Sequence, residues 1–139
     1  MRRSFLILIL VALVVSACGG DDSDPAATLD AYEAANNSGD IDAVMELFSD
    51  ESVVTGHPRA REAEGLEQIR LLHEVGLDSS AEEGAYTISN VEVNDNSVTW
   101  DHAWVNSSGE QFCFEGHSGV VKDDIILNWD WPGSGTQCD

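Results

Sequence analysis

The sequence of 139 residues predicts an α+β domain in which helices come first and an antiparallel sheet follows. Two observations carry this prediction. Apolar side chains recur at helical spacing in the first half, and from Tyr86 onward they alternate with polar side chains. Short turn signals such as 94–96 separate the alternating runs. Helices grouped before strands are typical of α+β domains, because alternating units would predict a parallel sheet instead.

The helical half contains three segments. The expected helices span 26–37, 41–48 and 66–75. Gly39 suits the left-handed position that ends the first helix, and Asp40 can cap the second. A short strand at 52–55 and a charged loop then lead into the third helix.

The sheet half is a meander of longer strands. The expected strands span 86–93, 98–105, 111–121 and 125–131. A loop at 106–109 would pair Val105 with Glu110, and this register sorts the side chains. One face of the sheet then carries Asp101, Ala103, Phe112, Phe114 and Gly116. The opposite face carries an aromatic cluster of Trp100, His102, Trp104, Trp129 and Trp131. A slip of one residue would reverse these faces.

The N-terminus has the composition of an export signal. A basic head with Arg2 and Arg3 precedes an unbroken apolar run at 5–15, and small residues follow at Ser16 and Ala17. A transmembrane anchor is the alternative. That run is shorter than the ~20 residues that span a bilayer, and acidic, glycine-rich sequence follows at once.

The end of this segment, Val15-Ser16-Ala17-Cys18, resembles the lipobox of bacterial lipoproteins. The resemblance implies that residues 1–17 are a signal peptide, that Cys18 is lipidated, and that 18–26 form an acidic tether. The protein would then lie outside the cytoplasm, in the bacterial cell envelope, anchored to a membrane by several acyl chains. The alternative is an ordinary secreted protein in which Cys18 has no special role.

The charge balance restricts the partners. The chain has 26 acidic and 6 basic residues, with a formal net charge of −20 at pH 7. Nucleic acid is excluded as a direct partner, because phosphate binding needs clustered Lys and Arg. The same imbalance argues against docking on an anionic membrane through a basic patch.

Cys113 and Cys138 are the cysteines left for the domain. Two thiols in an exported domain are more often paired than free, so we expect a disulfide that pins the tail, 133–139, to the strand that carries Cys113. A metal site is the alternative. Neither cysteine lies in a CxxC pair, and the four histidines lack an HxH or HxxxH spacing within one element. We therefore expect no metal and no cofactor.

Residues 32–54 and 125–131 resemble the opening and the last strand of the SnoaL-like branch of the nuclear transport factor 2-like superfamily. The opening reads helix, Gly-Asp, helix, Leu-Phe, acidic pair, strand. The resemblance implies a domain over 27–132, with a cone-shaped, curved antiparallel sheet wrapped around three N-terminal helices and an apolar pocket. Members include isomerases, cyclases, dehydratases and noncatalytic binding domains, so the fold alone does not assign a function.

The resemblance assigns roles residue by residue. Tyr32 matches the tyrosine that hydrogen-bonds the developing oxyanion in the isomerase branch; otherwise it is a core residue with a satisfied hydroxyl. Gly56 and Gly116 fall at the isomerase base and its second oxyanion donor, so ketosteroid isomerase chemistry is excluded. Asp130 matches the acid/base aspartate of the SnoaL-like cyclases, and Asn128 replaces the histidine of that pattern.

The predicted site is an apolar pocket that contains carboxylates. Its candidate catalytic residues are Asp130, Tyr32 and Asp101, and its predicted pocket residues are Phe112, Phe114 and Asn128. A buried carboxyl group among aromatic rings tends to stay protonated, which suits a general acid or base. The alternative is that Asp101 and Asp130 are rim carboxylates on an acidic surface.

Three functions fit these observations. The first is an exported, lipid-anchored domain that binds a small apolar molecule or acts as an accessory module. The second is an enzyme of the cyclase, dehydratase or isomerase type that uses Asp130 with Tyr32. The third is a module that docks a protein partner, or a second copy of the chain as a homodimer, through the aromatic face of the sheet. Because no catalytic set is complete, binding is favoured over catalysis.

Overall fold

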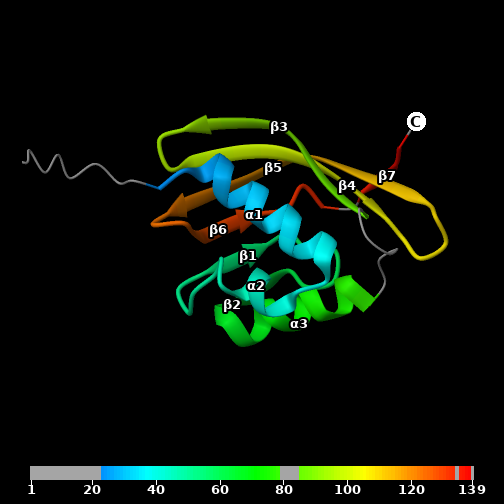
Figure 1. Cartoon of the computed structure of the whole chain (residues 1–139), viewed down its shortest axis with the longest axis horizontal. Coiled ribbons are helices and arrows are strands. Elements are labelled where there is room, and N and C mark those ends of the chain that lie inside the picture. The colour runs from blue at the N-terminus through cyan, green and yellow to red at the C-terminus, as the bar shows by residue number, and fades with distance from the viewer. Residues whose placement is uncertain (1–22, 79–84, 134, 139) are drawn as a thin grey trace, which may run out of the picture.

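The computed structural model describes residues 23–78, 85–133 and 135–138 (Figure 1). The predicted signal peptide, Cys18 and most of the 18–26 tether lie outside the described residues. The helices are α1 (Pro25–Ser38), α2 (Ile41–Met45) and α3 (Gly65–Asp78). The strands are β1 (Val53–Thr55), β2 (Glu62–Glu64), β3 (Tyr86–Asn94), β4 (Ser97–Val105), β5 (Gln111–Lys122), β6 (Ile125–Asp130) and β7 (Thr136–Gln137). Among the helices described, none is both long and apolar enough to cross a bilayer.

The strands form one sheet in the order β2-β1-β6-β5-β4-β3, and β7 pairs with β5. Neighbouring strands run antiparallel except β1 and β6, which are parallel. Figure 1 shows the sheet curving around α1, while α2 and α3 lie beside β1 and β2. The chain is therefore an α+β domain with N-terminal helices and a curved sheet, as the sequence predicts. Its hydrophobic core lies between the helices and the inner face of the sheet.

Local signals explain where the first two helices begin and end. The Asp24 carboxylate accepts hydrogen bonds from backbone N–H groups at the start of α1, and Gly39 ends that helix with φ 69°. Asp40 caps α2 by accepting from the Ala43 N–H at 3.1 Å. α2 ends at Met45, earlier than predicted, because the following residues continue in tighter i→i+3 turns.

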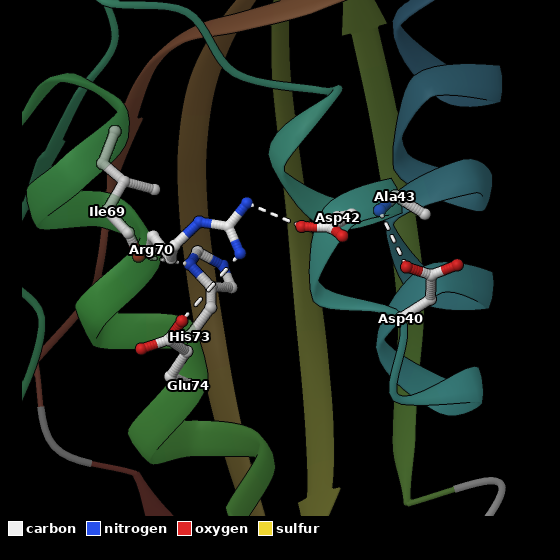
Figure 2. A network of polar contacts seen from close by, with 7 residues as sticks. All are labelled: Asp40, Asp42, Ala43, Ile69, Arg70, His73 and Glu74. Carbon is white, nitrogen blue, oxygen red and sulfur yellow. Dashed lines mark hydrogen bonds and ion pairs between the residues drawn. The ribbon is translucent and has the colours of Figure 1, made fainter.

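One charged side chain links α3 to α2 (Figure 2). Arg70 lies 2.7 Å from Asp42 of α2 and 3.9 Å from Glu74, one turn further along α3. Both acidic partners are exposed, so these pairs contribute little to stability. They help to hold α3 in place, and α3 carries His73, whose ring hydrogen-bonds the Ile69 carbonyl in the same view.

The β4–β5 hairpin differs from the predicted register by one residue. Val105 pairs with Gln111, not with Glu110. The Asn106 side chain shapes this turn by accepting from two backbone N–H groups further along the loop. The Asn106 N–H also donates to the Glu110 carbonyl, which leaves three residues at the tip, and Gly109 there adopts the φ of 83° that is typical of a bulged glycine. The loop between Val105 and its partner therefore has five residues, where four were predicted, and the side chains of β5 exchange faces as a result.

A β-bulge in β5 shifts the register once more, further along the same pair of strands. Trp100 pairs with His117 and His102 pairs with Phe114, so β5 holds one more residue than β4 between these pairs. Side chains on both sides of the bulge therefore point the same way. The inner face of the sheet carries Trp100, His102, Trp104, Phe112, Phe114 and His117. The predicted division of these residues between two faces is wrong.

Asp101 lies on the outer face and braces the bend of the sheet. One carboxylate oxygen accepts from the Gly116 N–H and the other from the Asn90 side-chain amide, each at 2.7 Å. Gly116 and Asn90 both have positive φ, so Asp101 of β4 joins the irregular positions of β5 and β3. The bond from Asn90, and then the bond from Gly116, lower the pKa of Asp101.

Two short strands are not predicted from the sequence. β2 lies in the charged loop before α3 and pairs with β1. β7 lies in the tail and pairs with β5 beside the Cys113–Cys138 disulfide, which is present in the structure. The tail packs closely on the sheet, because a Cβ atom on Gly135 would come within 2.5 Å of the Phe114 ring.

Candidate functional site

A cavity of about 200 Å³ lies between the helices and the inner face of the sheet. Its aromatic and imidazole lining residues are Tyr32, His57, His73, Tyr86, His102, Trp104, Phe114 and Trp131. The other lining residues are Asn36, Val54, Pro58, Arg59, Leu72 and Gly76. Residues from α1, α3 and the sheet therefore converge on a space walled mainly by rings.

The charge of this cavity is opposite to the charge of the protein. The chain has 26 acidic residues, yet none of the described residues that line the cavity is acidic. Arg59 is the lining residue with a permanent charge, and it is solvent-exposed, which places it at the opening. A negatively charged or neutral molecule would therefore meet no carboxylate among the described residues of the lining.

Tyr32 and His73 form a hydrogen bond whose direction can be assigned. His73 Nδ1 lies 2.8 Å from the Ile69 carbonyl, which can only accept, so Nδ1 carries the proton. His73 Nε2 lies 2.8 Å from the Tyr32 hydroxyl, so in the neutral ring Nε2 accepts and Tyr32 donates. The hydroxyl proton of Tyr32 is therefore already committed within the protein.

Burial holds the histidines around the cavity neutral. It lowers the pKa of His57 and His73 to about 4, that of His117 to about 3 and that of His102 to about 2. Burial also raises the pKa of Tyr32, which makes Tyr32 a weaker acid, and lowers the pKa of His73, which makes His73 a weaker base. Proton transfer from Tyr32 to His73 is therefore unfavourable. Because general acids and bases work best with a pKa near the ambient pH, none of these groups is tuned for proton transfer at pH 7.

The histidines of the sheet belong to an aromatic stack. His102 lies against three rings in near-parallel orientation, with centroid distances of 4.5 Å to Phe114, 4.5 Å to His117 and 4.7 Å to Tyr86. Trp100 extends the stack beyond His117 at 5.3 Å, and Trp131 meets His102 edge-on at 4.9 Å. Stacked and edge-to-face rings attract one another, so this packing fixes the orientation of the cavity wall.

Several buried polar atoms at the cavity have no hydrogen-bond partner in the part of the chain that the structure describes. They include the Tyr86 hydroxyl, His102 Nδ1 and Trp131 Nε1. Tyr86 is 8% exposed and His102 is 3% exposed. Buried polar groups are nearly always paired in folded proteins, so three unpaired groups around one cavity indicate a binding site.

The structure brings together part of the predicted site. Tyr32 and Phe114 line the cavity, while Phe112 packs beside Trp104 without lining it. The prediction that Asp101 faces the pocket is wrong. The five-residue loop places Phe112 and Phe114 on the face of His102 and Trp104, and Asp101 lies on the opposite face.

Asn128 and Asp130 also face away from the cavity. Both side chains are exposed, and Trp129 between them is 0% exposed. Asp130 accepts a hydrogen bond from the Thr55 hydroxyl at 2.7 Å on this outer side. The prediction that Asn128 and Asp130 point into the cone is therefore wrong, and Asp130 is not an acid or base for this cavity.

The aromatic cluster that the sequence assigns to the outer face lies inside. Trp100 is 1% exposed and Trp129 is 0% exposed, and Trp104 and Trp131 line the cavity. These tryptophans are therefore not available as an exposed docking face for a protein partner.

Sequence reasoning missed His57, His73 and Tyr86 as cavity residues. A signal existed for His73, which follows Ile69 by four residues and so shares the buried stripe of α3. Tyr86 opens β3, and its orientation depends on the register that was misassigned. In the described part of the chain, no group of three or more His, Cys, Asp or Glu side chains is arranged to hold a metal.

Known proteins share this architecture. A comparison with curated proteins found no match. Among solved structures, an NTF-2 like protein of unknown function from Burkholderia xenovorans LB400 aligns with a TM-score of 0.64 at 11% identity, covering 82% of this chain and 84% of that one. A protein with a ketosteroid isomerase-like fold from Catenulispora acidiphila, in complex with trimethylamine, aligns with a TM-score of 0.63 at 16% identity, covering 78% and 85%. A candidate polyketide cyclase from Sinorhizobium meliloti aligns with a TM-score of 0.58 at 16% identity, covering 75% and 92%.

Identities this low establish the fold and leave the activity open. The sequence itself matches a family model, that of the SnoaL-like domain, over residues 26–119. This match includes the three helices and the strands up to the middle of β5. The chain therefore belongs to the SnoaL-like domain family.

Proposed function

We propose that this protein is an exported, lipid-anchored SnoaL-like domain that binds a small ring compound in the cavity without transforming it. The observation that carries the proposal is the cavity wall, which combines aromatic rings with a few unpaired polar atoms. Small-molecule sites generally have this composition, since apolar walls supply affinity and a few polar groups supply orientation.

The volume of the cavity limits the size of the ligand. An apolar cavity of roughly 150 Å³ accepts benzene. A cavity of about 200 Å³ therefore accommodates one ring with a short substituent. Larger polycyclic ligands would require the cavity to open further.

Binding is favoured over catalysis because the cavity lacks a group poised for proton transfer. No carboxylate lines it among the described residues, and the histidines around it have pKa values of about 4 or below. A general base for neutral pH would need a pKa several units higher.

An enzyme of the cyclase or isomerase type is the second candidate. The observations that favour it are the Tyr32–His73 hydrogen bond inside the cavity and the similarity in fold to the candidate polyketide cyclase. Tyr32→Phe separates the two functions. A binding protein should retain its ligand affinity within a few-fold, whereas an enzyme should lose product formation, followed by mass spectrometry of incubated ligands.

The polar group of the ligand is a separate question. The Catenulispora protein was solved with trimethylamine, which is a cation at neutral pH. An ammonium ligand is therefore one chemistry to test in this cavity, and a ligand that carries a hydrogen-bond acceptor is the other.

Gly76 offers a direct test of cavity binding. It lies on α3 and lines the cavity, and among the described residues a Cβ atom placed there would meet Arg59 Nη1 alone, at 3.8 Å. Gly76→Leu should therefore fill the cavity and abolish the binding of single-ring probes such as acetophenone, measured by ligand-observed NMR. The fold should survive, because glycine is the weakest ordinary helix former. Gly76→Ala is the matched control and should bind nearly as the parent does. Equal binding by Gly76→Leu would show that ligands bind elsewhere.

The anchoring part of the proposal has its own test. Cys18→Ser removes the thiol that the lipobox resemblance marks for lipidation. The variant should leave the membrane fraction and lose the mass of the acyl chains. Retention in the membrane with the leader uncut would contradict lipid anchoring and leave cavity binding untouched.

A further inference from the structure

The donors and acceptors around the cavity are not balanced, and this imbalance selects a ligand class. Building on the proposed binding function, we infer that the natural ligand is a single-ring compound with a carbonyl or carboxylate group, which Arg59, Tyr86 and the tryptophan and histidine N–H groups recognise. Compounds whose polar group is an amine are disfavoured in the same cavity.

Three of the four histidines, His57, His73 and His117, already use their acceptor nitrogens within the protein. His57 Nδ1 accepts from the Arg59 backbone N–H at 3.1 Å. His73 Nε2 accepts from Tyr32, and His117 Nδ1 accepts from the Trp129 indole at 2.9 Å. A neutral imidazole has one acceptor and one donor, so His57 and His117 keep their protons on Nε2.

The polar groups of the cavity lining that have no partner among the described residues can all donate. Trp131 Nε1 can only donate, and His102 Nδ1 can donate in one tautomer of the neutral ring. The Tyr86 hydroxyl can donate or accept, and its own backbone is held in place by two 2.8 Å bonds with the Asn37 side chain. A ligand with an acceptor would therefore satisfy groups that an amine, itself a donor, would leave unpaired.

The charge of the cavity lining also disfavours an ammonium ligand. An ammonium group in a low-dielectric site needs a carboxylate or equivalent partner, and the described lining residues include no acidic side chain. Arg59 instead supplies a positive charge at the opening, where a carboxylate would meet it. The ring faces could attract a cation, but the nearby guanidinium opposes that attraction.

Three probes of similar size test the inference on the full-length protein at pH 7.5. They are phenylacetate, an anionic acceptor; acetophenone, a neutral acceptor; and 2-phenylethylammonium, a cationic donor. Ligand-observed NMR titration should give about tenfold tighter binding for phenylacetate than for the ammonium probe, the effect of one charge-assisted hydrogen bond. Acetophenone should also bind more tightly than the ammonium probe.

Two variants assign this selectivity to residues. Arg59→Gln should weaken phenylacetate about tenfold and leave acetophenone unchanged. Arg61→Gln is its matched control, since it removes the same charge two residues away from a side chain outside the cavity lining. Tyr86→Phe should weaken both acceptor probes by about fivefold, the contribution of a neutral hydrogen bond.

The outcomes separate this inference from the function on which it rests. Tighter binding of the acceptor probes supports it, provided that Arg59→Gln weakens phenylacetate alone and Tyr86→Phe weakens both acceptor probes. Equal or tighter binding of 2-phenylethylammonium overturns it, while the cavity remains a ligand site if Gly76→Leu abolishes that binding. If none of the three probes binds, both the inference and the proposed binding function fail.

Discussion

Tyr32 and Tyr86 are neighbouring buried tyrosines whose hydroxyl groups have different surroundings. Their rings meet edge to face with centroids 5.7 Å apart. The Tyr32 hydroxyl donates to His73. The Tyr86 hydroxyl interacts with the Tyr32 side chain but is buried without a hydrogen bond of ordinary length to any described residue. Desolvating a polar group without a hydrogen bond costs free energy, so the second hydroxyl weakens the unliganded fold. Such a cost is expected where a ligand supplies the missing partner.

Removing each hydroxyl tests this reading through stability alone. Tyr86→Phe should leave the free energy of unfolding unchanged or raise it by up to about 1 kcal/mol, because no bond is lost. Tyr32→Phe should lower it by about 1–2 kcal/mol, because His73 Nε2 loses its donor. Urea unfolding of both variants measures the difference. A loss of stability in Tyr86→Phe equal to that in Tyr32→Phe would mean that Tyr86 has a structural bond.

At the scale of elements, the curvature of the sheet depends on irregular positions in β3 and β5, the two strands that flank β4. Asp101 of β4 joins them by bonding Gly116 of β5 and Asn90 of β3. Bulges bend a strand and redirect the side chains beyond it. Here the bulge in β5 turns His117 inward, so the aromatic stack depends on it.

Asp101→Ala should therefore destabilise the fold by about 1 kcal/mol, discounted for the exposure of the carboxylate. Gly116→Ala should cost about 1–2 kcal/mol because φ is positive there. Since the two residues share one hydrogen bond, the double variant should lose less than the sum of the single losses. Glu115→Ala, in the same bulge, is the control for loss of charge. Strict additivity in the double-mutant cycle would argue against the brace.

The elements show what the sequence could and could not predict. Hydrophobic periodicity located the three helices and the four long strands, because each buries a continuous stripe or face. β2 and β7 are too short to show a period. The faces of β5 were misassigned because side-chain parity depends on the length of one loop, and Asn106 lengthens that loop through its side chain. With the faces of the sheet reversed, the prediction put Asp101 inside and Trp100, His102 and Trp104 outside.

At the scale of the whole molecule, charge and aromatic residues are separated. The acidic side chains cover the outside, and none of the described cavity-lining residues is acidic. The histidines lie with the aromatic residues, and burial is the main cause of the lowered pKa of each. The interior of this small domain therefore accepts little charge of either sign.

This arrangement predicts acid sensitivity. The folded-state pKa values of His73, His102 and His117 lie between about 2 and about 4. The unfolded chain titrates near pH 6.5, so it binds more protons than the folded chain below that pH. Stability should be flat above pH 7 and should fall as the pH drops below about 6.5. Each buried histidine contributes about 1.4 kcal/mol per pH unit in that window.

Urea unfolding between pH 7.5 and pH 5 measures this slope. His73→Gln should reduce it, because the variant has one fewer group to protonate on unfolding. A free energy of unfolding that stays constant down to pH 5 would mean that the histidines are protonated in the folded protein, contrary to their burial.

The tail that the disulfide holds covers part of an exposed edge of the sheet. β6 pairs with β5 only from Ser118 to Lys122, and β7 pairs with Phe112 and Cys113 further back along the same side. An unpaired strand edge is a template on which another chain can add a strand. By covering this stretch, a tail held by the Cys113–Cys138 disulfide protects the domain from edge-to-edge aggregation. Reduction of the Cys113–Cys138 disulfide would release β7 and, at the same time, expose the unpaired edge of β5 that β7 covers.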